Sequence, residues 1–171
     1  MNSPHLANNS AGKMLILVRH AKSDWGNAGL NDFDRPLNER GKRDAPKMTQ
    51  RLVDKSISVD AIVCSPAKRA ATTATFFAEA FNTKPEYVQE LYLAAPETFY
   101  KIIASLKDSW NSVMVVSHNN GLTDFANMLT NARIDNIPTC GVFAVKADCN
   151  SWEQFREAKK EFLFFDYPKN S

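Results

Sequence analysis

The chain has 171 residues, of which 44% are apolar and 23% are charged, and its formal net charge is +2. This length and composition predict one globular domain with a substantial core. The nearly even charge, without any dense run of lysine and arginine, argues against a nucleic-acid-binding protein, and no apolar run approaches the ~18 residues that span a bilayer.

The amino-terminal residues, MNSPHLANNSAG, are small and polar, and they predict a disordered tail at 1–12 followed by a single domain at 13–171. They lack the basic start and apolar middle of a targeting signal. The cysteines Cys64, Cys140 and Cys149 are odd in number and have no CxxC spacing, which argues against a disulfide framework and against a zinc site. We therefore expect a cytoplasmic protein, a monomer or weak dimer, that binds neither nucleic acid nor membranes.

Strands and helices alternate along the chain. Short apolar runs predict strands at residues 14–19, 60–65, 86–89, 112–117, 141–147 and 161–166. Residues 67–81 and 96–107 have helical spacing of apolar side chains, and the second of these segments opens with Pro96. This alternation predicts an α/β fold, a three-layer α/β/α sandwich with a mainly parallel central sheet of about six strands, one of them antiparallel.

The segment NERGKRDAPKMTQRLVDK also has helical character, but it contains Pro46. Proline lacks the backbone N–H and clashes with the preceding helical turn. We therefore expect either a helix that begins at Asn38 and kinks, or a helix that restarts behind a cap at Asp44.

Residues that can carry chemistry follow three of the expected strands. The first strand ends in Arg19 and His20, the second continues into CSPAKRA with Ser65 and Arg69, and the fourth ends in VVSHNNG with His118. If these strands are parallel, their carboxyl ends lie on the same edge of the sheet, where ligands bind. Two arginines and two histidines would meet there with few acidic neighbours. This predicts an anion site, and a phosphoryl group is the anion that most often needs several such donors.

These motifs resemble those of a known family. VRHAKSDW is similar to the signature of the histidine phosphatase superfamily, in which Arg-His-Gly is followed by an acidic residue, Thr or Ser, and Trp; SPAKRAATTA and VVSHNNGL resemble its second and third motifs. FDRPLNERGKRDAP resembles more narrowly the SixA-like branch, named for its phosphohistidine phosphatases. Motifs in this order across residues 14–130 are far more specific than any one of them.

The resemblance implies a phosphoglycerate mutase-like fold and a phosphatase that needs no metal and no cofactor. His20 would be the nucleophile that carries a transient phosphoryl group. Arg19, Arg69 and His118 would stabilise the negative charge of the transition state. The implied partner is a protein bearing phosphohistidine or a small phosphate ester.

Other site positions are less determined. We expect Ser23 and Asn119 to bind the substrate. Ser23 matches the Thr or Ser of the first motif and would donate a hydrogen bond, and Asn119 stands in the third motif where many relatives have glycine. Gly26 stands where many relatives have an asparagine that contacts phosphate. Relatives that cleave sugar phosphates place an acidic general acid after the second motif, and Glu90 in VQELYLA is the nearest match by order. A phosphohistidine substrate relaxes this need, because its imidazole leaving group titrates near neutral pH.

Rival enzyme classes fit less well. Four residues separate Cys64 from Arg69, one fewer than a cysteine phosphatase loop requires. No G-x-S-x-G elbow, P-loop or Rossmann glycine pattern occurs in the sequence. A small-molecule phosphomonoesterase remains the alternative within the family. A non-catalytic module that binds phosphorylated proteins remains the alternative from another class, although the presence of His20 favours an enzyme.

The lengths of the loops bear on the substrate. The loops before LNERG and after ELYLAAP are the only insertions of any size, and both are modest. Little chain is left to build a lid, so we expect an open pocket. An open pocket admits a phosphorylated side chain on another protein, whereas an enzyme for a small metabolite gains by enclosing it. Trp25, Trp110 and Trp152 are interpreted as core or surface packing.

Overall fold

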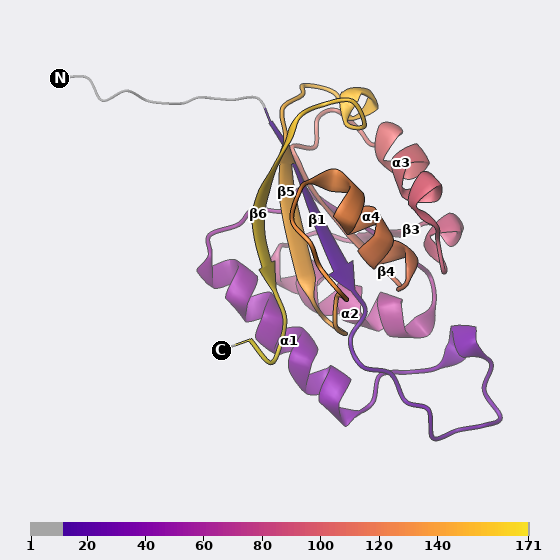
Figure 1. The fold of residues 1–171 in the computed structure, drawn as a ribbon. Coiled ribbons are helices and arrows are strands. Elements are labelled where there is room, and N and C mark those ends of the chain that lie inside the picture. Colours follow the sequence, from indigo (N-terminus) through magenta and orange to yellow (C-terminus); the bar gives the residue numbers. More distant parts are fainter. Residues whose placement is uncertain (1–11, 171) are drawn as a thin grey trace.

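The computed structural model describes residues 12–170, in which helices cover both faces of one six-stranded sheet (Figure 1). The strands are β1 (Lys13–Arg19), β2 (Ala61–Cys64), β3 (Pro85–Tyr87), β4 (Ser112–Ser117), β5 (Val142–Ala147) and β6 (Lys160–Asp166). The α-helices are α1 (Glu39–Asp54), α2 (Lys68–Ala80), α3 (Pro96–Ala104) and α4 (Gly121–Leu129). The short 3₁₀ helices are η2 (Asp32–Asp34), η3 (Gln89–Leu91) and η4 (Trp152–Gln154). The tail expected at 1–12 falls outside the described residues except for Gly12. Within residues 12–170, no helix is long and apolar enough to cross a membrane.

The strand order of the sheet is β3-β2-β4-β1-β5-β6. β3, β2, β4 and β1 run parallel to one another, whereas β5 is antiparallel to both of its neighbours, β1 and β6. The predicted α/β fold with a mainly parallel sheet and one antiparallel strand is confirmed. The parallel strands place the carboxyl ends of β1, β2 and β4 on the same edge.

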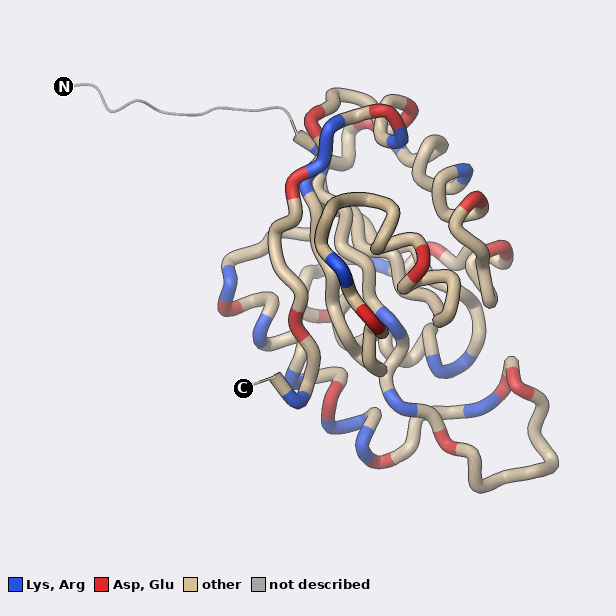
Figure 2. The backbone as a smooth tube through the Cα atoms, in the orientation of Figure 1, with Lys and Arg blue, Asp and Glu red and all other residues tan. Residues whose placement is uncertain are grey.

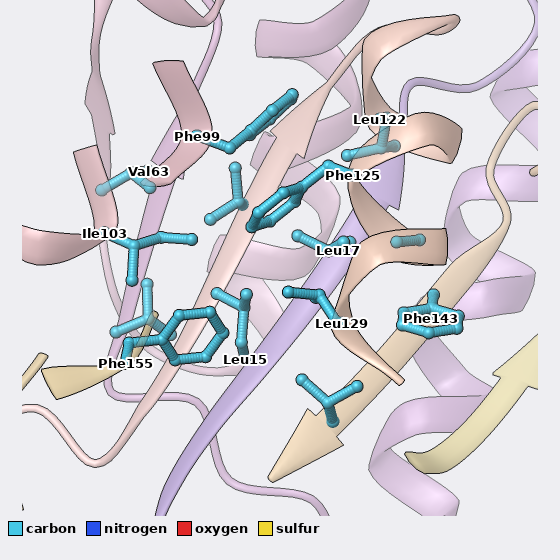
Figure 3. Packing of buried hydrophobic residues seen from close by; sticks show 14 of the residues in the cluster. Leu15, Leu17, Val63, Phe99, Ile103, Leu122, Phe125, Leu129, Phe143 and Phe155 are labelled. Carbon is cyan, nitrogen blue, oxygen red and sulfur yellow. The ribbon is translucent and has the colours of Figure 1, made fainter. Parts of the chain in front are cut away.

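Alternate side chains of β1 enter two separate core layers. Leu15 faces α3 and α4, where the rings of Phe99 and Phe125 stack with centroids 5.0 Å apart (Figure 3). Ile16, the next residue along the strand, faces α1 and α2 and joins Phe77. The sheet is therefore the middle layer of three, and the apolar run of β1 is buried on both faces.

Helix α1 continues through Pro46 without interruption. The side chain of Asn38 caps the helix by accepting a hydrogen bond from the first turn, so the expected restart behind Asp44 is wrong. Met48 and Leu52, beyond the proline, are fully buried against the sheet. Packing of this face offsets the cost of the one backbone hydrogen bond that proline removes.

A long loop joins β1 to α1 and projects from the carboxyl edge of the sheet (Figure 1). Ser23 and Leu37 form an isolated antiparallel bridge that holds the two ends of the loop together. η2 lies in its second half. The loop is therefore anchored beside the strand end that carries Arg19 and His20.

Candidate active site

The carboxyl edge of the sheet brings together three of the predicted site residues. Arg69 Nε lies 3.3 Å from His20 Nε2, and the ring centroids of His20 and His118 are 5.1 Å apart. The exposed fractions of these residues are 2% for Arg69, 7% for His20 and 1% for His118. Residues that are far apart in the sequence meet because they follow parallel strands of one sheet.

Arg19, the last residue of β1, adds a second guanidinium to this cluster. Its Nη1 donates a hydrogen bond of 2.9 Å to the carbonyl oxygen of Ile137. Burial lowers the pKa of both histidines, and the positive charge of Arg19 adds to this effect. Burial and the charge of Arg69 in turn lower the pKa of Arg19. The cluster thus crowds like charges together, and a bound anion would relieve their repulsion.

Two nitrogen atoms of the cluster are buried without a hydrogen-bond partner. Among the described residues, three buried side-chain polar atoms lack a partner: Arg19 Nε, His118 Nδ1 and Ser112 Oγ. An unpaired buried donor costs about 1–3 kcal/mol, so such an atom marks a place where a ligand supplies the acceptor. His118 Nε2 lies 2.7 Å from Ser65 Oγ. With that hydroxyl donating to Nε2, Nδ1 carries the ring proton and is a donor like Arg19 Nε.

The contacts of His20 fix its tautomer. Nδ1 lies 2.7 Å from the carbonyl oxygen of Ala21, which can only accept, so Nδ1 carries the proton. Nε2 accepts from Arg69 Nε–H and is therefore unprotonated. Burial lowers the pKa of His20 to about 3, and the nearby positive charges act in the same direction. At neutral pH the ring is neutral, and Nε2 offers a lone pair for nucleophilic attack.

Three residues that the sequence pattern did not indicate complete the cluster: Asp32, Arg35 and Tyr92. The Asp32 carboxylate accepts hydrogen bonds from Arg69 Nη2 at 2.9 Å, from Arg35 Nη2 at 3.0 Å and from the Tyr92 hydroxyl. Burial raises the pKa of the Asp32 carboxyl, but these hydrogen bonds outweigh burial and hold that pKa well below its usual range. Asp32 is therefore a carboxylate that carries no proton.

The remaining predicted site residues lie around this cluster or outside it. Ser23 is buried, and its hydroxyl oxygen accepts a hydrogen bond of 2.6 Å from Arg35 Nη1. The side-chain oxygen of Asn119 accepts from the backbone N–H and the hydroxyl of Thr123, and its amide nitrogen donates to the segment before β5. These contacts use the hydrogen-bonding groups of Asn119 inside the fold. Glu90 is exposed in η3.

The donor set of the cluster suits an anion. Within residues 12–170, no three His, Cys, Asp or Glu side chains come together in a way that could hold a metal ion. The groups at the site are guanidinium and imidazole nitrogens, and the one carboxylate among them is engaged by arginines. Such donors bind the oxygen atoms of a phosphoryl group.

Comparisons with known proteins agree with this geometry. Residues 15–92 match the family model described as "Histidine phosphatase superfamily (branch 1)". An uncharacterized protein of Mycobacterium tuberculosis is 30% identical over 162 residues, which cover 89% of this chain and 100% of that protein. The chain belongs to the histidine phosphatase superfamily.

Within the superfamily, the fold is that of the SixA-like branch. A SixA protein of Agrobacterium tumefaciens, provisionally assigned as a phosphohistidine phosphatase, is 28% identical with a TM-score of 0.79, covering 91% of this chain and 98% of that chain. Over a shorter stretch of 70 residues, phosphoserine phosphatase 1 of Hydrogenobacter thermophilus is 44% identical, covering 40% of this chain and 32% of that protein. The predicted family, branch and phosphoglycerate mutase-like fold are confirmed.

The two buried histidines of this superfamily member predict that its stability depends on pH. Burial lowers the pKa of His118, as it does that of His20, to about 3. In the unfolded chain both groups titrate near ~6.5. The unfolded state therefore binds more protons between these values, so the free energy of unfolding decreases as the pH falls through this window.

Between pH 7 and pH 5 we expect each histidine to remove about 2 kcal/mol from the free energy of unfolding. Urea denaturation across this range measures the loss. The variant His118→Asn should lose about half as much stability as the wild type over the same range. A variant that follows the wild-type curve would show that His118 is not held neutral in the folded state.

Proposed function

We propose that this protein is a metal-independent phosphatase that hydrolyses phosphohistidine on other proteins through a phosphoryl intermediate on His20. Membership of the superfamily supports phosphatase activity in general. The observation that carries the proposal is the pair of unpartnered buried nitrogen atoms, Arg19 Nε and His118 Nδ1, in the cluster that holds the neutral nucleophile.

The geometry suggests the following course of reaction. Nε2 of His20 attacks phosphorus, the P–N bond of the substrate breaks, and its electron pair stays on the leaving imidazole nitrogen. Arg69 Nε–H turns from Nε2 to a phosphoryl oxygen, while Arg19 and His118 donate to the other equatorial oxygens. Water then attacks the phosphoryl group on His20, which releases inorganic phosphate and restores the free ring. The arginines supply positive charge that Mg²⁺ supplies in other phosphoryl-transfer enzymes.

The protonation and position of the nearby carboxyl groups favour a substrate with a P–N bond over an alkyl phosphate ester. An alkoxide leaving group needs a proton from a general acid. Asp32, which is hydrogen-bonded to Arg69, carries no proton, and Glu90 is exposed outside the cluster. An imidazole leaving group titrates near neutral pH and can depart already protonated. The likeness to a SixA protein provisionally assigned as a phosphohistidine phosphatase supports the same substrate class.

A small phosphate ester is the second candidate substrate. The 44% identity over 70 residues to a phosphoserine phosphatase favours it.

We also propose a cytoplasmic location. The cysteines Cys64, Cys140 and Cys149 are free and buried, which suits a reducing compartment.

A comparison of substrates tests the proposed function. We expect kcat/KM to be highest for a phosphohistidine-bearing protein in a panel with sugar phosphates, phosphoserine and an aryl phosphate. Excess EDTA should leave this rate unchanged, because no step needs a metal ion. Glu90→Gln should retain the activity, since no proton from Glu90 is required.

Two results would contradict this proposal in different ways. A sugar phosphate as best substrate, together with its selective loss in Glu90→Gln, would make Glu90 a general acid and exclude the protein substrate. Loss of activity in EDTA would exclude the metal-independent mechanism.

A further inference from the structure

The two loops beside the cluster expose large apolar side chains. Among the described residues, seven large hydrophobic side chains are exposed, and three of them lie in these loops: Trp25 at 69%, Leu30 at 38% and Leu93 at 56%. Trp25 and Leu30 belong to the loop between β1 and α1, and Leu93 follows η3. We propose that these three residues, the apolar rim, are the docking surface for a folded protein that presents its phosphorylated histidine to His20. This inference rests on the proposed function.

A chain of contacts connects Trp25 to the cluster. The guanidinium carbon of Arg35 lies 3.5 Å from the centroid of the Trp25 ring. Arg35 also donates to the Asp32 carboxylate, which accepts from Arg69. Arg35 is buried, so one face of the indole covers a site arginine while most of the ring remains in solvent. A partner that covers this ring would lie next to the phosphoryl-binding groups.

The second loop contacts the first. The ring of Phe33 lies 5.2 Å from the ring of Tyr92, the residue that precedes Leu93. The Tyr92 ring is in turn 5.4 Å from the ring of His118. Leu93 and the β1–α1 loop therefore border the same cluster. They are far apart in the sequence, since Leu93 follows Asn31 of that loop by 62 positions.

The tip of the β1–α1 loop is uncharged and contains two local turns. Residues 25–31 include no charged side chain (Figure 2). The backbone N–H of Gly26 donates to Asp24 Oδ1 at 2.7 Å, and that of Gly29 donates to Asn27 Oδ1 at 3.0 Å. Local turns of this kind reduce the conformational entropy that the loop loses when a partner covers it. Exposed aromatic and aliphatic groups beside a charged centre resemble the core of a protein interface.

Leu93 is exposed, and its backbone conformation destabilises the folded protein. Its backbone has φ 51°, in the left-handed region. A leucine in this conformation costs about 1 kcal/mol or more relative to glycine, whereas asparagine tolerates it better. The side chain packs little in the free protein, so its burial by a partner would be its main favourable contribution.

Two cavities of the protein exclude the catalytic side chains, although Tyr92 and Leu93 line part of the larger one. A cavity of about 770 Å³ lies between β3 and α3, and one of about 530 Å³ lies between α1 and the carboxyl-terminal segment. Neither is lined by His20, Arg69 or His118. A small metabolite gains from enclosure, whereas a protein substrate supplies its own surface to exclude water from an open site. The charge of the cluster would bind the phosphoryl group, and the apolar rim would bind the surface around it.

Two substrates with the same scissile bond test this proposal. One is free phosphohistidine, and the other is a folded protein phosphorylated on histidine with potassium phosphoramidate. We expect Trp25→Ala, and the double variant Leu30→Ala with Leu93→Asn, to lower kcat/KM for the protein substrate at least about tenfold, mainly through KM. Free phosphohistidine should be hydrolysed within about twofold of the wild-type rate, because it is too small to cover the rim. Leu93→Asn alone should not lower the melting temperature.

The matched control is Val53→Ala, which removes a 40% exposed side chain from the outer part of α1 and should leave both rates unchanged. If the rim variants lose kcat/KM equally on both substrates, the substitutions act on the chemical step, and the proposal is overturned. An unchanged rate on the phosphorylated protein would also overturn it. Failure of the proposed function would look different, since the wild type would then hydrolyse neither phosphohistidine substrate, and the docking proposal would fall with it.

Discussion

Replacing His20 with alanine is expected to lower kcat by at least about 10⁴-fold, because the variant has no nucleophile to accept the phosphoryl group. The wild type, incubated with a labelled phosphodonor, should form an adduct that is stable in alkali and labile in acid, as expected of phosphohistidine. His20→Ala should form no such adduct. Circular dichroism and the urea midpoint check that the variant is folded.

The sequence offers a matched control for this experiment. The chain has three histidines, and His5→Ala changes the one that lies outside the described residues. It should keep both the rate and the adduct. An adduct that persists in His20→Ala would show that another residue is the nucleophile. Binding of a phosphoprotein by the wild type, without adduct or turnover, would instead favour the non-catalytic module.

Replacing Arg69 with alanine is expected to lower kcat by about 10²–10³-fold, the usual effect of losing one preorganised donor to the transition state. Arg69 has two roles in the structure. Its Nε contacts His20 Nε2 at 3.3 Å, and its Nη1 and Nη2 hold the backbone oxygen and the carboxylate of Asp32. Without the guanidinium, the negative charge of Asp32 would be less well paired near the incoming phosphoryl group.

Two further variants separate charge from geometry. Arg69→Lys keeps the charge but loses the planar fork of donors, so its kcat should lie between those of the wild type and Arg69→Ala. Lys68→Ala removes the exposed cation next to it and should have the wild-type rate. A rate for Arg69→Ala within about threefold of the wild type would remove Arg69 from the proposed transition-state contacts.

The local pattern of the sequence determined the strands and the sheet edge on which the site lies. Short apolar runs specified the strands, and the alternation of strands with helices specified a mainly parallel sheet. Parallel strands share a carboxyl edge, so the placement of Arg19, His20, Arg69 and His118 after strand ends predicted their meeting. The local rule for Pro46 was less reliable, because burial of the same helix on the sheet outweighs one missing hydrogen bond.

Only the tertiary structure decided which loop residues complete the cluster. Asp32 lies 37 positions from Arg69 and 60 from Tyr92, yet its carboxylate joins both. The motif FDRPL includes Arg35, whereas Asp32 lies just before it, and nothing in the spacing of these two residues indicates which distant side chain they contact. The physical reason is that periodicity encodes only which face of a helix or strand is buried. The path of a loop has no such period and is fixed by long-range hydrogen bonds, which also set the protonation of Asp32 and the tautomer of His20.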